Sequence, residues 1–131
     1  MLRGGAVAGR TGLADLAVRG GRIVRVDDDL GHLPAARTLA LDGRLVVPGF
    51  VDAHVHLDKA YLLDRAPSRE GTLAEAIRVT GFAKRGFTVD DIRTRARAVL
   101  DRAVACGTTA MRGHVEVDPI IGLRSVEAVL P

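Results

Sequence analysis

The chain has 131 residues, of which 47% are hydrophobic and 27% are charged, and these proportions exclude a disordered or fibrous protein. Nineteen basic against 16 acidic residues give a net charge of +3. No run of like charges forms a patch and aromatic residues are scarce, so we expect no nucleic-acid partner.

No targeting or membrane-spanning segment is predicted. The first 13 residues contain two arginines and four glycines instead of the apolar core of a signal peptide, and no apolar run approaches 18 residues. The single cysteine, Cys106, excludes an internal disulfide and is expected to be a small buried residue. We therefore expect a cytoplasmic protein with no membrane partner.

Residues 1–47 predict a small β layer. Alternating runs within residues 13–26 flank Gly20 and Gly21, which is the pattern of a β-hairpin with a tight turn. A second hairpin is predicted where residues 38–41 and 45–47 flank Asp42 and Gly43.

Residues 48–131 predict alternating strands and helices, and Pro48 with Gly49 separates them from the β layer. The predicted elements are a strand at 50–57, a helix at 73–84, a helix between Thr88 and Gly107, a strand at 108–117 and a helix at 121–130. Strand, helix and strand in this order imply parallel strands with a helical crossover, so the predicted fold class is α/β.

The two longer helices have different apolar patterns. Leu73, Ala76 and Ile77 can share one face of the helix at 73–84. In the next helix, Thr88 is a candidate cap, and apolar residues from Ile92 onward recur at spacings of three and four.

His54 and His56 occupy alternate positions of the first strand after the β layer. Residues i and i+2 of a strand point to the same face, so the two imidazoles could bind one metal ion. Two ordinary strand histidines are the alternative interpretation, because His-x-His alone is a weak signal. The position near the carboxyl end of the strand favours a metal site, since barrel enzymes place their functional groups there. His32 lies in a predicted loop and is expected to be solvated.

The segment that contains these histidines resembles the first-strand signature of the amidohydrolase superfamily. Residues 47–58 read V-P-G-F-V-D-A-H-V-H-L-D. The following Lys59, residues 71–73 (G-T-L), residues 111–119 (M-R-G-H-V-E-V-D-P) and residues 121–124 (I-G-L-R) are similar to the cytosine deaminase-like branch. The resemblance runs from about residue 13 to the end of the chain and departs from the branch at Gly113, where a threonine is frequent.

The resemblance has direct implications for the fold. Residues 1–47 would be part of a β-sandwich domain, and residues 48–131 would form the first β/α units of a TIM-type (β/α)8 barrel. The barrel would be incomplete, because 131 residues are about half of the roughly 250 that a closed barrel needs.

The resemblance also implies a metal site. In this family the two histidines of the first strand bind a divalent metal, zinc or iron(II), which activates a water for attack on a ring or amide carbon. His54 and His56 are therefore the expected ligands. Asp58, Lys59 and His114 are candidates for contacts with a ligand or with the substrate; a loop salt bridge or a structural histidine are the alternatives.

The implied function is hydrolysis of carbon–nitrogen bonds, with deamination of cytosine or a related nitrogen heterocycle as the leading hypothesis. Another superfamily member, such as a cyclic amidase or an N-alkylaminotriazine aminohydrolase, and a non-catalytic truncated gene product are the alternatives. We expect the chain alone to be inactive, because the main acid–base residues of the family would lie beyond Pro131. The sequence leaves open the exact substrate, the metal and the oligomeric state.

Overall fold

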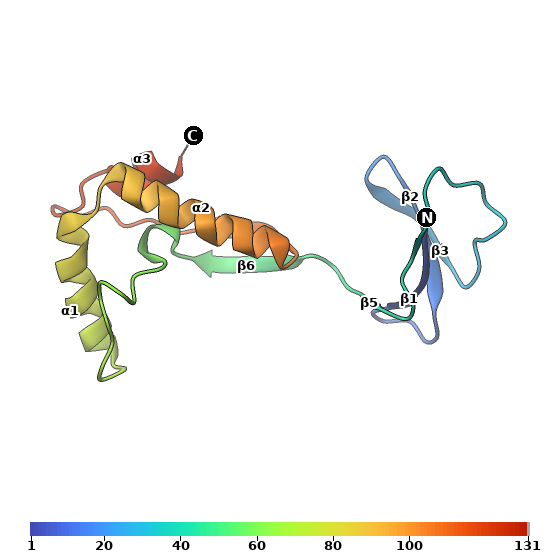
Figure 1. The fold of residues 1–131 in the computed structure, drawn as a ribbon, viewed down its shortest axis with the longest axis horizontal. Helices are drawn as coiled ribbons and strands as arrows, with labels where there is room; N and C mark the ends of the chain where they lie inside the picture. Colours follow the sequence, from blue (N-terminus) through green and yellow to red (C-terminus); the bar gives the residue numbers. More distant parts are fainter. Residues whose placement is uncertain (131) are drawn as a thin grey trace. The chain divides into compact units, whose positions relative to one another are not determined.

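The computed structural model describes residues 1–130, and the chain divides into two compact units, Met1–Pro48 and Gly49–Pro131 (Figure 1). The first unit consists of strands, and the second combines strands with helices. The chain is thus a mixed α/β protein, as predicted. Within residues 1–130, no helix has both the length and the apolar character needed to cross a bilayer.

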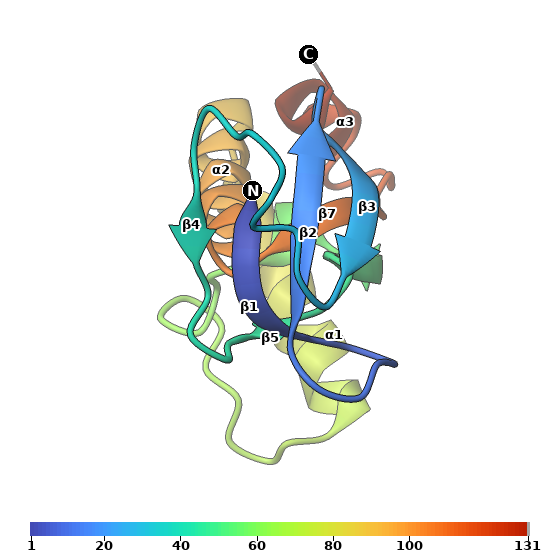
Figure 2. The ribbon, with the colours of Figure 1, turned by 90° about the vertical axis from the view of Figure 1, so that its right-hand side faces the viewer.

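The first unit is a five-stranded sheet in which β1 is central. Its strands are β1 (Leu2–Val7), β2 (Ala14–Arg19), β3 (Arg22–Asp27), β4 (Leu39–Ala40) and β5 (Leu45–Val46). Figure 2 shows β1 between β2 and β4, and β2 continues to β3 in the order β3-β2-β1-β4. The antiparallel hairpin of β2 and β3 is confirmed, and it turns at Gly20 and Gly21, both with positive φ.

The predicted second hairpin is wrong, because β4 and β5 each pair in parallel with β1 and not with one another. Asp42 and Gly43 do form a turn with positive φ, but the Gly43 N–H donates to the Gly4 carbonyl at 2.8 Å. The turn therefore carries the chain along β1. Gly5 permits this close approach, since a Cβ there would lie 2.6 Å from the Leu41 side chain.

A buried carboxylate joins three parts of the first unit. Asp15 on β2 is 4% exposed and accepts hydrogen bonds from the backbone N–H groups of Gly4 at 2.9 Å and Leu30 at 3.0 Å. The Arg3 Nε donates to it at 3.1 Å. These donors stabilise the charged form, first the Leu30 N–H and then that of Gly4, so they lower the pKa of Asp15 below 3.8.

The second unit contains two parallel strands connected through helices. Its elements are β6 (Phe50–Val55), the 3-10 turn η1 (Leu57–Lys59), α1 (Leu73–Ala83), the 3-10 turn η2 (Lys84–Gly86), α2 (Val89–Ala105), β7 (Thr108–Gly113) and α3 (Arg124–Val129). The parallel pairing of β6 with β7 confirms the predicted crossover arrangement. Both strands end earlier than predicted, at Val55 and Gly113, so the chain leaves the sheet directly into loops.

The helix predicted after Thr88 is confirmed as α2, although Leu100 of its apolar repeat is exposed. Thr88 caps the helix by accepting the Asp91 N–H, and Ile92 and Ala96 are buried as their spacing indicates. Ile92 belongs to the core cluster of this unit, which consists of Leu62, Ala66, Phe87, Ile92, Ile121 and Ala128.

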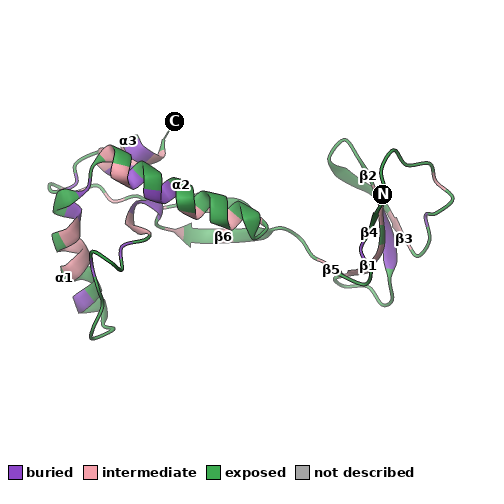
Figure 3. Cartoon of the chain, viewed as in Figure 1, coloured by how far each residue is buried: buried purple, intermediate pink, exposed green. Residues whose placement is uncertain are grey.

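The predicted helix at 73–84 is present as α1, but its apolar face is not buried. Leu73 and Ile77 are 77% and 66% exposed, and Figure 3 shows α1 as largely exposed or half-buried. The buried residue of this helix is Glu75, whose carboxylate accepts the Ser68 hydroxyl and the N–H groups of residues 69–71. The loop before α1 therefore folds around the first turn of this helix, and the Glu75 carboxylate accepts the hydrogen bonds that the loop donates. These bonds, the Arg69 N–H foremost, lower the pKa of Glu75.

The expectation of a buried Cys106 is also wrong, since this residue is exposed. It forms the carboxyl-terminal cap of α2, whereas the residues that α2 buries, Ile92, Arg95 and Ala96, lie in its amino-terminal half. The last turns of the helix therefore extend beyond the core cluster.

We predict that Thr88→Ala lowers the free energy of unfolding of the second unit by about 1 kcal/mol, because the Asp91 N–H loses its acceptor. Urea unfolding followed by circular dichroism measures the loss. The control is Thr94→Ala on the same helix, whose exposed hydroxyl only donates to the Asp90 carbonyl and should matter little. Equal destabilisation by both substitutions would contradict the capping role.

We also predict that Asp15→Asn destabilises the first unit at pH 7. The difference in stability between this variant and the parent chain should shrink as the pH falls below 3.8. A pKa lowered by folding contributes stability that is fully present above the unfolded value and is lost as the pH falls through the folded value. Thermal unfolding at several pH values, monitored through the NMR signals of residues 1–48, tests this pH dependence. Asp28→Asn is the control, because the Asp28 side chain is 82% exposed; an Asp15→Asn deficit that stays constant down to pH 2 would contradict the linkage.

Candidate metal centre

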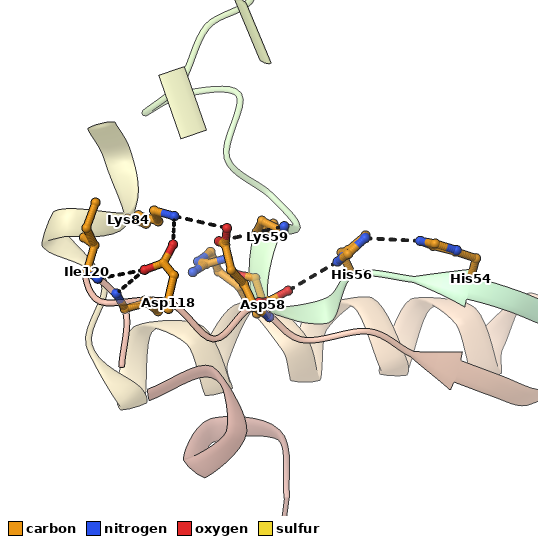
Figure 4. Close-up of polar contacts among 10 residues, drawn as sticks. His54, His56, Asp58, Lys59, Lys84, Asp118 and Ile120 are labelled. Atoms are coloured by element: carbon orange, nitrogen blue, oxygen red, sulfur yellow. Dashed lines mark hydrogen bonds and ion pairs between the residues drawn. The ribbon is translucent and has the colours of Figure 1, made fainter. Parts of the chain in front are cut away.

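His54 and His56 lie at the carboxyl end of β6, and their imidazoles converge. The strand places both side chains on one side, and the two Nε2 atoms lie 3.2 Å apart (Figure 4). The predicted convergence of the two rings is thereby confirmed. Both residues are exposed, so the ring nitrogens are accessible to a ligand.

The separation of these nitrogens suits a shared metal ion. Two nitrogens bound to one tetrahedral zinc ion at about 2.0–2.1 Å lie about 3.3–3.4 Å apart. The observed 3.2 Å is close to this value. In residues 1–130, however, no group of three or more His, Cys, Asp or Glu side chains is arranged to hold an ion. The pair therefore provides part of a coordination sphere, and metal binding by it stays a prediction.

His114 lies beside the pair rather than within it. It follows β7, and its N–H donates to the Val55 carbonyl at 2.8 Å, which extends the pairing of the two strands. Its ring stacks on that of His54 with centroids 4.0 Å apart and planes inclined by 22°, whereas the His56 ring is 5.8 Å away. In this position His114 restricts the orientation of the His54 ring.

Asp58 is buried directly behind His56. It is 1% exposed, and its Oδ2 accepts the Glu116 N–H at 2.8 Å. Its Oδ1 lies 3.9 Å from the His56 Nδ1 and has no hydrogen-bond partner among residues 1–130. A carboxylate beside Nδ1 favours the tautomer that carries its proton there, which leaves Nε2 free to bind a metal. The orphaned oxygen therefore fits a metal-binding His56.

Both lysines of the chain converge on Glu116, in the loop after β7. Lys84 donates to Glu116 Oε1 at 3.1 Å, and Lys59 Nζ lies 3.8 Å from Glu116 Oε2. Lys84 also contacts Asp118 (Figure 4). The Lys84 ammonium, followed by the Ile121 N–H, lowers the pKa of Asp118 to about 2. The contact with Asp118 in turn raises the pKa of Lys84. Lys59, a predicted pocket residue, is therefore paired with an acidic neighbour.

Lys84, Glu116 and Arg95 were not predicted as site residues, although Glu116 lies within the segment 111–119 that carries the family resemblance. Arg95, on α2, donates to the carbonyls of Asp58 and Ala60, both at 2.8 Å. One signal was available: the chain uses arginine almost exclusively, and the only two lysines are Lys59 and Lys84. No comparable signal distinguished Arg95 from the other arginines.

Known proteins of one family match most of this chain. The amidohydrolase family model matches residues 37–128. N-isopropylammelide isopropyl amidohydrolase of Pseudomonas sp. (strain ADP) is 30% identical over 135 residues, which cover 99% of this chain and 33% of that protein. Pterin deaminase of Rhizobium rhizogenes is 32% identical over 106 residues, covering 79% of this chain and 24% of that protein.

A solved structure shares the fold. The crystal structure of 5-methylcytosine deaminase from Klebsiella pneumoniae, liganded with 5-fluorocytosine, matches 98% of this chain and 32% of that one, with a TM-score of 0.82 and 30% identity. The chain thus spans about a third or less of the length of these relatives. It belongs to the amidohydrolase family, and within that family it is similar to the cytosine deaminase branch.

Proposed function

We propose that this chain is the amino-terminal part of a metal-dependent hydrolase that deaminates cytosine or a related nitrogen heterocycle. The observation that carries the proposal is the convergence of the His54 and His56 Nε2 atoms at 3.2 Å, at the carboxyl end of a strand that is paired in parallel. Functional groups of α/β barrels gather at this end of the strands.

His54 and His56 would hold the divalent cation, zinc or iron(II). The chemistry that such an ion supplies is activation of water at neutral pH for attack on carbon. The chain's own residues prepare the site: Asp58 favours the proton on His56 Nδ1, and His114 stacks on His54. Each ring is then restrained before a ligand arrives.

A nitrogen heterocycle as substrate is supported by the relatives. The names of the two aligned enzymes specify an ammelide and a pterin, and the structural relative is a 5-methylcytosine deaminase. Release of an alkylamine from an aminotriazine is the second candidate. It is favoured by the alignment of 99% of this chain with N-isopropylammelide isopropyl amidohydrolase.

We predict that the 131-residue chain binds zinc or cobalt(II) weakly, and that His54→Ala or His56→Ala weakens this binding about tenfold or more, because each removes half of the imidazole pair. Isothermal titration calorimetry measures the affinity. With either zinc or ferrous iron, the chain alone should release no ammonia from cytosine, since proton transfer needs acid–base groups within hydrogen-bond reach of the attacked atom.

His32→Ala is the matched control, because His32 is an exposed histidine of the other unit and should leave metal binding unchanged. Equal effects of His32→Ala and His54→Ala would contradict the site, and ammonia release that depends on His54 would contradict the inactivity of the chain. A longer protein that contains this chain should deaminate a nitrogen heterocycle and lose that activity with His54→Ala.

A further inference from the structure

Arg95 is the only buried arginine among residues 1–130, with 6% of its surface exposed. Its Nη1 donates to two backbone carbonyls, those of Asp58 and Ala60, both at 2.8 Å. Burial of a guanidinium is costly unless its donors are satisfied, so these contacts are strong constraints on the positions of both carbonyls.

The two carbonyls belong to the short turn that follows the histidine pair. The 3-10 turn η1 has three residues, and His56 at its start makes no side-chain capping bond. Such a short turn has weak hydrogen bonds of its own and leaves carbonyls without partners at its end. Arg95 supplies these partners from α2, and it therefore fixes the path of the chain from His56 through Asp58.

The guanidinium itself is held from two further sides. Its Nε and Nη2 donate to Asp91 Oδ2 at 3.2 and 3.0 Å, one helical turn earlier on α2. Its carbon lies 4.6 Å from the centre of the Phe87 ring. A lysine could not make all these contacts, because its single ammonium lacks the planar fork of donors.

We propose that Arg95 is a positioning residue of the candidate metal centre, which it serves by holding the turn that carries His56 and Asp58. The inference rests on the proposed function. Arg95 contacts neither histidine, and it acts through the backbone of Asp58, whose carboxylate lies beside the His56 Nδ1. Without Arg95, the Asp58 carboxylate would be held only by the Glu116 N–H, and its position behind the imidazole would be less restricted.

The test uses Arg95→Met and Arg95→Lys in the whole chain, with zinc affinity from calorimetry and amide hydrogen exchange of residues 57–61 as readouts. Arg95→Met should weaken zinc binding about tenfold, the range seen when partners behind a metal ligand are removed. It should also accelerate exchange in this turn more than elsewhere in the unit. Arg95→Lys should restore part of both properties.

Two controls separate positioning from a general loss of stability. Arg97→Met removes an arginine whose side chain is 83% exposed on the same helix, and Ile92→Val trims the core without touching either carbonyl. Neither should change zinc affinity. The comparison is made between Ile92→Val and an Arg95 variant that lose the same stability. If both weaken zinc binding equally, Arg95 is only structural and the proposal is overturned.

The remaining outcomes are also decisive. If Arg95→Met does not fold, Arg95→Lys decides: an affinity and an exchange rate equal to those of the parent chain would overturn the proposal. If the parent binds zinc through His54 and no Arg95 variant alters that binding, positioning fails while the proposed function stands. If the parent binds no zinc, the proposed function fails, and hydrogen exchange still shows whether Arg95 holds the turn.

Discussion

The parallel pairing of β6 with β7 is the constraint on which the candidate site depends. It aligns the carboxyl ends of two strands that are far apart in the sequence, and the His114 N–H bound to the Val55 carbonyl continues it past both strand ends. The loops that leave the sheet there are joined again where Asp58 accepts the Glu116 N–H. Three histidines thereby gather at one edge, although only His54 and His56 are neighbours in the sequence.

Next to the histidine pair lies a group of charged side chains, of which Asp58 and Lys84 are buried and Glu116 and Asp118 are half-buried. Asp58 uses one carboxylate oxygen to hold the next loop and keeps the other toward His56. Lys84 links Glu116 and Asp118 to the end of α1, so the loop after β7 is fixed from two directions. A buried charge is costly without partners, and each of these groups except the Asp58 Oδ1 has one. This unpartnered oxygen is the one that faces His56, a proposed metal ligand.

The parts of this arrangement that depend on local spacing were predictable from the sequence. Convergence of His54 and His56 follows from the two-residue period of a strand, and the Thr88 cap follows from its place before an apolar repeat. Contacts between distant segments were not predictable: the strands around Asp42 join β1 rather than each other, and a loop folds around Glu75. Arg95 belongs to this second group, because its burial depends on the turn that packs against α2.

We propose that His54, near the end of β6, and His56, directly after this strand, share one divalent cation. Zinc at this position can be located in crystals of the chain soaked in zinc, from diffraction data collected on both sides of the zinc absorption edge. We expect an anomalous peak between the Nε2 atoms of His54 and His56, with Asp58 within hydrogen-bond distance of the His56 Nδ1. A map in which zinc occupies other sites, with no anomalous peak between these two nitrogens, would contradict this proposal.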